Sequence, residues 1–182
     1  ERGLLAARDG EPGAFTESDD DVVEALLELP GDAGGWDAAI ALMRVGDRAD
    51  AIGSIGRIQE MAEEDDSDSG RRQLARVLGL LLTRHGPLEP EPASKVIDSV
   101  ELIYPSGVFE TDRVLVEVLV ALDAPSVIAR TLPLIEAADR QETAIIFLHA
   151  LRLQKSGWDE DSRGRVMSAL DRAKSYSGGA SL

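Results

Sequence analysis

Apolar side chains recur three and four residues apart along almost the whole chain, and glycine, proline and acidic clusters interrupt them at intervals. This spacing puts the apolar side chains on one face of an α-helix. Hydrophobic residues make up 43% of the 182 residues, but aromatic residues only 4%. A core built from alanine, leucine, valine and isoleucine favours helices packed on helices over a sheet. The sequence therefore predicts an all-α fold.

The interruptions divide the chain into segments that we expect to be helical. We expect one domain over residues 1–182, with an irregular lead-in over 1–17 and a flexible exit over 177–182. Pro133 should kink its helix, because proline lacks the N–H that a helix needs. The expected helices span about residues 20–29, 36–45, 48–64, 71–84, 93–103, 111–122, 125–137, 141–154 and 159–175.

The sequence also predicts local roles for four residues. Gly53 and Gly56 lie inside the expected helix 48–64 and cost about 1 kcal/mol each relative to alanine. We expect them to permit close approach of a neighbouring helix rather than to break their own. Thr111 should cap the helix that follows it, and Pro125 should lie in a first turn, where a missing N–H does no harm.

The expected helices alternate between two sets, with start-to-start spacings of about 30–44 residues, the range of two-helix repeats. The stretch 125–135, followed by Asp139-Arg140 and an alanine-rich helix, resembles one HEAT repeat. We therefore expect a right-handed HEAT-like αα-solenoid of about four to five helix pairs, each burying its apolar face against the next. A compact helical bundle is the alternative. The sets begin near Trp36, Arg71, Asp112 and Gln141, and near Asp20, Arg48, Pro92, Pro125 and Asp159.

Composition excludes several classes of function. The chain has 34 acidic and 19 basic residues, a formal net charge of −15, which argues against nucleic-acid binding. It has no cysteine, so it holds no disulfide, thiolate metal site, cysteine nucleophile or covalently attached haem. No apolar run approaches the roughly 20 residues of a membrane span. No signal peptide is visible, and a start at Glu1 leads us to expect a piece of a longer protein.

Motifs in residues 70–181 resemble the HEAT-like region of large secreted proteins of the planctomycete type. In those proteins a dehydrogenase-like β-propeller is often followed by HEAT-like repeats and then by a c-type haem domain with Cys-x-x-Cys-His. This chain contains neither the propeller nor the haem motif, so the resemblance carries over no catalytic or haem-ligating residue. It implies an exported or periplasmic, spacer-like module of a redox protein, with a haem domain encoded shortly after Leu182. The motifs are Tyr104-Pro105-Ser106-Gly107-Val108-Phe109 with Asp112-Arg113, Asp123-Ala124-Pro125-Ser126-Val127, Arg130-Thr131-Leu132, Gln141-Glu142, Leu148-His149-Ala150-Leu151-Arg152, Lys155-Ser156-Gly157-Trp158 and Tyr176-Ser177-Gly178-Gly179-Ala180-Ser181.

Two acidic stretches match a calcium-binding loop only in part. Asp65 and Gly70 fall at loop positions 1 and 6, but position 12 is Arg76 and not the bidentate glutamate. The stretch that begins at Asp159 fails likewise, with Leu170 at position 12. We expect both to be solvated loops, and we expect no metal or cofactor.

The remaining conspicuous residues have structural interpretations. His85 and His149, the only two histidines, lack the spacing of a zinc pair. Trp36 and Trp158 each follow a glycine at a helix entry, and we expect them to staple adjacent repeats rather than to bind a ligand. We also expect the Asp-Arg pairs at 47–48, 112–113 and 139–140 to form a ladder of caps and ion pairs between repeats.

The chain shows no phosphate-binding loop, no nucleophile elbow and no nucleophile–base pair at recognisable spacing. We therefore expect a non-catalytic interaction or spacer module whose partner is a protein, either a neighbouring domain or a separate chain. The alternative is an enzyme on a HEAT scaffold, such as a DNA-repair glycosylase. That enzyme needs a basic, aromatic-lined groove, which the charge and the aromatic content oppose.

If the chain binds a partner, we expect it to use the concave face of the solenoid, where arginines from neighbouring repeats meet. Bidentate arginine contacts there suit an anionic protein segment. The alternative is that these arginines pair with nearby glutamates and are worth under about 1 kcal/mol each. The expected binding residues are Arg72, Arg76, Arg113, His149 and Arg152, beside Thr83, Glu117 and Glu142.

Overall fold

The structure, a computed structural model, describes residues 33–176 of the chain. Within that range it contains nine α-helices and no strand, which confirms the all-α prediction. The expected helix 20–29 and the segments 1–17 and 177–182 lie outside the described residues. The helices are α2 (Ala33–Val45), α3 (Arg48–Gly53), α4 (Ile55–Glu64), α5 (Asp68–His85), α6 (Pro90–Ile103), α7 (Phe109–Ala121), α8 (Val127–Ala137), α9 (Gln141–Leu151) and α10 (Glu160–Ala173).

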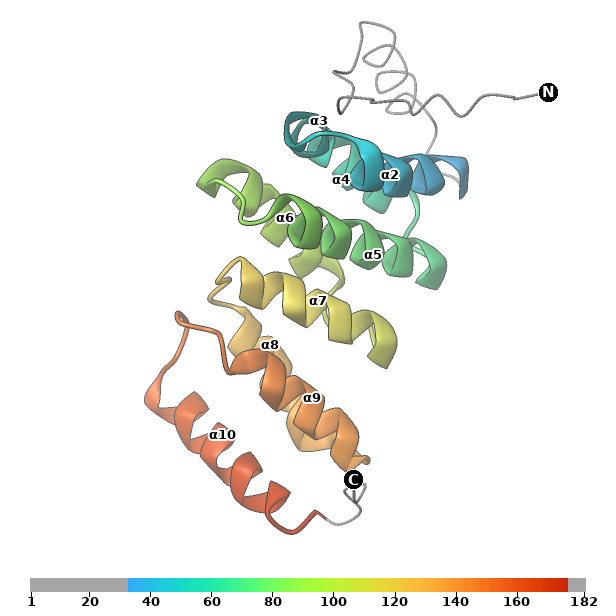
Figure 1. Cartoon of the computed structure of the whole chain (residues 1–182). Coiled ribbons are helices and arrows are strands. Elements are labelled where there is room, and N and C mark those ends of the chain that lie inside the picture. Colours follow the sequence, from blue (N-terminus) through green and yellow to red (C-terminus); the bar gives the residue numbers. More distant parts are fainter. Residues whose placement is uncertain (1–32, 177–182) are drawn as a thin grey trace, which may run out of the picture.

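The helices lie in two rows. In the first row, α2 packs on α5, α5 on α7, and α7 on α9, so that each helix contacts the next one of its row (Figure 1). In the second row, α4 packs on α6, and α8 on α10. Each second-row helix also contacts the first-row helix that follows it in sequence, as α4 does with α5, α6 with α7 and α8 with α9.

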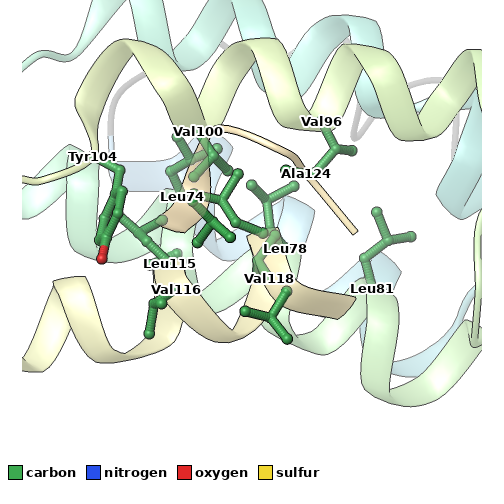
Figure 2. Packing of buried hydrophobic residues seen from close by; sticks show 14 of the residues in the cluster. Leu74, Leu78, Leu81, Val96, Val100, Tyr104, Leu115, Val116, Val118 and Ala124 are labelled. Atoms are coloured by element: carbon green, nitrogen blue, oxygen red, sulfur yellow. The ribbon is translucent and has the colours of Figure 1, made fainter. Parts of the chain in front are cut away.

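A continuous apolar core fills the space between the rows. Figure 2 shows its central part, where side chains of α5, α6 and α7 point toward one another. Leu81, Val96 and Leu115 are fully buried there, one from each helix. The buried positions of α5 recur three and four residues apart, as the sequence pattern predicts: Leu74, Ala75, Val77, Leu78 and Leu81.

The prediction of a single helix over residues 48–64 is wrong. The chain forms α3 and α4 with an interruption at Ser54, whose hydroxyl donates to the carbonyl of Ala51 at 2.9 Å. Gly53 ends α3, because glycine and a serine bonded to the backbone both weaken a helix. A Cβ at Gly53 or Gly56 would meet nothing within 4 Å, so neither glycine permits a close approach.

Several helix ends also differ from the sequence prediction. Ser67 caps α5 by accepting from the N–H of Gly70, so α5 begins three residues earlier than expected. α7 begins at Phe109, which places Thr111 inside its first turn instead of at the cap. α8 begins at Val127, which leaves Pro125 before the helix, and Pro133 lies inside α8.

Side chains at the ends of the second-row helices join successive pairs. Arg130 of α8 donates to the carbonyls of Glu101 and Tyr104, at the end of α6, at 2.8 and 2.7 Å. The Tyr104 hydroxyl lies 2.7 Å from the hydroxyl of Thr131, and burial raises the pKa of Tyr104. Such bonds occupy carbonyls that a helix end leaves free, and they hold α6 against α8.

Candidate functional site

The five expected binding residues all lie on or just beyond first-row helices and are all exposed. Arg72 and Arg76 belong to α5, Arg113 to α7 and His149 to α9, while Arg152 follows the last residue of α9. The surface that these helices share therefore decides whether the arginines form a site.

A groove of about 540 Å³ runs between α7 and α9, and we call it the α7–α9 groove. Arg113, His149 and Arg152 all line it, so the structure brings three of the five expected residues together. Glu117 contributes the one carboxylate of its lining. The other lining residues are apolar: Val120, Ala121, Ile145, Ile146, Ala150 and Leu153.

Two of these apolar side chains are unusually open to solvent. Ile145 is 46% exposed and Leu153 is 62% exposed. An isolated exposed leucine is ordinary, but two large apolar side chains in one groove mark a candidate binding surface. Neither residue is among the binding residues expected from the sequence. Helical spacing carries a signal for Ile145, which lies four residues before His149 on one face of α9, but none for Leu153, which lies beyond the end of that helix.

The polar groups of the groove are partly paired with one another. Arg113 forms an ion pair with Glu117 at 3.6 Å, one turn along α7. Arg152 donates to the His149 ring at Nδ1, at 2.8 Å, and to the His149 carbonyl at 2.7 Å. The alternative that these arginines pair with nearby glutamates therefore applies to Arg113. Such an exposed pair is worth at most about 1 kcal/mol, so a ligand can displace it.

Arg72 and Arg76 lie apart from this groove. The next groove, of about 250 Å³, runs between α5 and α7 and is lined by Gly79, Thr83 and Glu117 among others. Arg76 lies three residues before Gly79 and seven before Thr83, so the three share one stripe of α5. Neither arginine lines either of these two grooves, and neither makes an ion pair within residues 33–176.

The acidic loop before α5 is occupied by protein contacts. Hydrogen bonds from Ser67 hold the pKa of the Asp65 carboxyl below its usual range, and the Trp36 indole N–H donates to the same carboxylate at 3.2 Å. Trp36 belongs to α2 and is only 1% exposed, and its hydrogen bond to Asp65 links α2 to this loop. Asp159 caps α10, and its bonds with Ser162 lower its pKa. Among residues 33–176 no three acidic or histidine side chains gather as a metal site requires.

The Asp-Arg pairs act as separate local contacts and not as a ladder of ion pairs. Asp47 caps α3 by accepting from the N–H of Asp50 at 2.9 Å. Arg48 donates to the carbonyls of His85, the last residue of α5, and of Pro87, two residues beyond it. Buried Asp112 accepts from the N–H of Ser106 at 2.6 Å, and Arg140 pairs with Glu142 at 3.8 Å. The prediction of caps holds at Asp47, whereas Asp112 lies inside α7 and bonds to the preceding loop instead of capping a helix. Within residues 33–176 the predicted ion pairs between repeats do not form.

Comparison with known proteins adds no family to these observations. No family model, no curated protein and no solved structure matches the chain. No helix within the described residues is long and apolar enough to cross a membrane.

Proposed function

We propose that the chain is a HEAT-like αα-solenoid that acts as a non-catalytic interaction module, and that its α7–α9 groove binds an acidic, partly apolar segment of a partner protein. The observation that carries the proposal is the composition of that groove. It combines two arginines, one glutamate and two exposed large apolar side chains, in a chain whose net charge is −15.

The two-row arrangement supports the solenoid. Each first-row helix contacts its neighbours in the row, and the strong contacts within residues 33–176 join helices that are close in sequence. A solenoid grows in one direction, whereas a compact bundle also brings its first and last helices together. A compact protein of 182 residues has a radius of gyration of about 16 Å. In X-ray scattering we expect a clearly larger radius, and a value near 16 Å would contradict the solenoid.

The chemistry of the groove selects the partner. Arg113 and Arg152 favour carboxylates, which arginine binds through two parallel hydrogen bonds. Ile145 and Leu153 favour apolar side chains between those carboxylates, because contact removes both apolar surfaces from water. An acidic amphipathic helix offers both features along one face.

The positions of the two exposed apolar side chains set a register for that helix. Ile145 lies six residues, or about 9 Å along the axis, before the last residue of α9, and Leu153 follows two residues beyond that end. Two leucines seven residues apart on a partner helix are separated by about 10.5 Å and lie on one face. We therefore expect a bound segment to present leucines at positions i and i+7, flanked by glutamate or aspartate.

A synthetic peptide tests this proposal. The probe is an 18-residue helical peptide with leucines at i and i+7 and glutamates at its other exposed positions, and its control carries lysines instead. In fluorescence anisotropy we expect the acidic peptide to bind more weakly as salt rises, and the basic peptide not to bind. The double variant Arg113→Glu/Arg152→Glu should weaken binding at least tenfold, because two favourable pairs become repulsive.

A matched double variant distinguishes binding in the groove from a general effect of the net charge of the protein. Arg44→Glu/Arg84→Glu makes the same change of charge at two exposed arginines outside the groove. We expect it to bind the acidic peptide nearly as well as the unaltered chain does. Equal loss in both double variants would show that only overall charge matters and would reject the proposed site.

We also propose, on the resemblance of residues 70–181 alone, that the module belongs to a larger exported protein with a c-type haem domain. Reading the coding sequence after Leu182 for Cys-x-x-Cys-His tests this. A following sequence without that motif would leave the interaction module standing and remove the haem context.

A further inference from the structure

A third groove, of about 400 Å³, lies between α4 and α6 in the other row, and we call it the α4–α6 groove. Its character is opposite to that of the α7–α9 groove, because its charged lining residues are Glu63, Asp66 and Asp98. Asp66 pairs with Arg71 at 2.7 Å, whereas Glu63 and Asp98 make no ion pair within residues 33–176. Leu102 also lines it and is 77% exposed.

The last helix carries the complementary pattern. Arg163, Met167, Leu170 and Lys174 follow one another at intervals of four, three and four residues, so they form one stripe along α10, which we call the α10 stripe. Met167 is 59% exposed and Leu170 is 43% exposed. Arg163 makes no ion pair in the described part of the chain, and Lys174 pairs with Asp171 at 2.6 Å.

The position of α10 explains why this stripe is open. The buried side of α10 faces α8 and α9, and Arg165 fixes it there through two hydrogen bonds of 2.7 Å to Glu136. α4, α6 and α8 are each also covered by the first-row helix that follows them, but among residues 33–176 no helix follows α10. Within the described part of the chain, two large apolar side chains of α10 therefore face solvent.

We propose that the α10 stripe of one copy of this chain binds in the α4–α6 groove of a second copy. The basic ends of the stripe lie against Glu63 and Asp98, and Met167 and Leu170 cover Leu102. The contact joins two exposed apolar surfaces of complementary charge, and neither surface is covered by another part of residues 33–176. It is independent of the peptide site, because the two grooves lie in different rows.

The same observations exclude the simpler arrangements. The α10 stripe cannot reach the groove of its own chain, because the contacts with α8 and α9 hold α10 in place. Two stripes packed antiparallel would bring Arg163 of one copy beside Lys174 of the other, and like charges oppose that dimer. The proposed contact joins two different surfaces, so single contacts produce chains or rings of copies, and two reciprocal contacts produce a symmetric pair.

A mixing experiment tests this contact. Leu102→Glu inactivates the groove and leaves the stripe intact, whereas Met167→Glu/Leu170→Glu inactivates the stripe and leaves the groove intact. All three positions are exposed, so the fold should survive, and circular dichroism checks this. In sedimentation velocity the unaltered chain should associate as its concentration rises into the hundreds of micromolar, and each variant alone should remain at 19.5 kDa, with association at least tenfold weaker.

The mixture decides the matter, because each variant keeps the surface that the other lacks. Equal amounts of the two should give a complex of about 39 kDa, twice the 19.5 kDa of one chain, and nothing larger. Leu153→Glu, in the α7–α9 groove, serves as the control and should associate as the unaltered chain does. Three results would each overturn the proposal: an unaltered chain that stays monomeric, a variant that still associates, or a mixture that stays at the mass of one chain.

Discussion

The carboxylate of Asp123, in the turn after α7, accepts a hydrogen bond of 3.0 Å from the backbone N–H of Ser156, in the turn after α9. The N–H of Lys155 donates to the same oxygen, also at 3.0 Å, and the Ser156 hydroxyl donates to the Asp123 carbonyl at 2.8 Å. Gln154 extends the contact by donating to the Ala124 carbonyl at 3.1 Å. One aspartate thus ties two consecutive helix pairs together at their turns.

Removing that carboxylate should destabilise the fold. Asp123→Ala loses the acceptor for two backbone N–H groups and leaves alanine at φ 53°, a conformation that aspartate and asparagine tolerate better. We expect a loss of about 2 kcal/mol in the free energy of unfolding, measured by urea denaturation. Asp123→Asn keeps an acceptor and the backbone preference, so it should lose about 1 kcal/mol or less. Equal stability of the unaltered chain and Asp123→Ala would show that the turn contact contributes nothing.

The same carboxylate should make stability depend on pH. Hydrogen bonds from the backbone N–H groups of Ser156 and Lys155 lower the pKa of Asp123 in the folded state. A lowered pKa contributes stability that is present above the unfolded value, about 3.9, and is lost as pH falls through the folded value. The difference between the unaltered chain and Asp123→Asn should therefore be largest near pH 7 and vanish near pH 2. A difference that grows as the pH falls would contradict this assignment.

Two glycines with the same backbone conformation should respond differently to alanine. Gly157 has φ 79° and Gly107 has φ 80°. A Cβ at Gly157 would lie 2.1 Å from the carbonyl oxygen of Pro125, whereas a Cβ at Gly107 would meet nothing within 4 Å. Gly107→Ala should cost only the left-handed backbone strain, about 1 kcal/mol. Gly157→Ala should cost at least about 1 kcal/mol more, because the turn after α9 has to move away from Pro125. Equal losses in thermal unfolding would contradict the close approach of the two turns.

Two leucines test where the core lies. Leu78 is 1% exposed between α5, α6 and α7, and Leu102 is 77% exposed on α6 (Figure 2 shows Leu78). Leu78→Ala leaves a cavity and should cost about 2–5 kcal/mol. Leu102→Ala makes the same chemical change at the surface and should alter the free energy of unfolding by under about 0.5 kcal/mol. The comparison is made at low micromolar concentration, and comparable losses would place Leu102 in the core.

Much of the fold follows from local sequence. Apolar spacing locates the helical segments of residues 33–176, although it joins α3 and α4 into one, because each helix buries one stripe against its neighbours. The interruption at Ser54 was missed because spacing of three continues through it, and only a side-chain bond to the backbone reveals the break. The early start of α5 is not visible in the apolar spacing because its first turn is polar, and α7 begins earlier than expected because Thr111 has the chemistry of a cap but lies inside the first turn that Phe109 opens.

The candidate site was only partly predictable. Helical spacing puts Arg113 and Arg152 on polar faces, but the distance between those faces depends on how α7 and α9 pack. Arg76 belongs to a comparable face and still lines no groove. Ile145 shares a helix face with His149, but an apolar residue on a helix is first assigned to the core, and Leu153 lies beyond the end of α9, where helical spacing gives no signal.

The most direct test of the proposed function is a backbone-amide NMR titration of the whole chain with the acidic peptide bearing leucines at i and i+7. The account predicts chemical-shift changes confined to residues 113–121 and 145–153, which vanish in Arg113→Glu/Arg152→Glu and do not occur with the lysine peptide. Shift changes centred on the α4–α6 groove, or equal changes with both peptides, would contradict it.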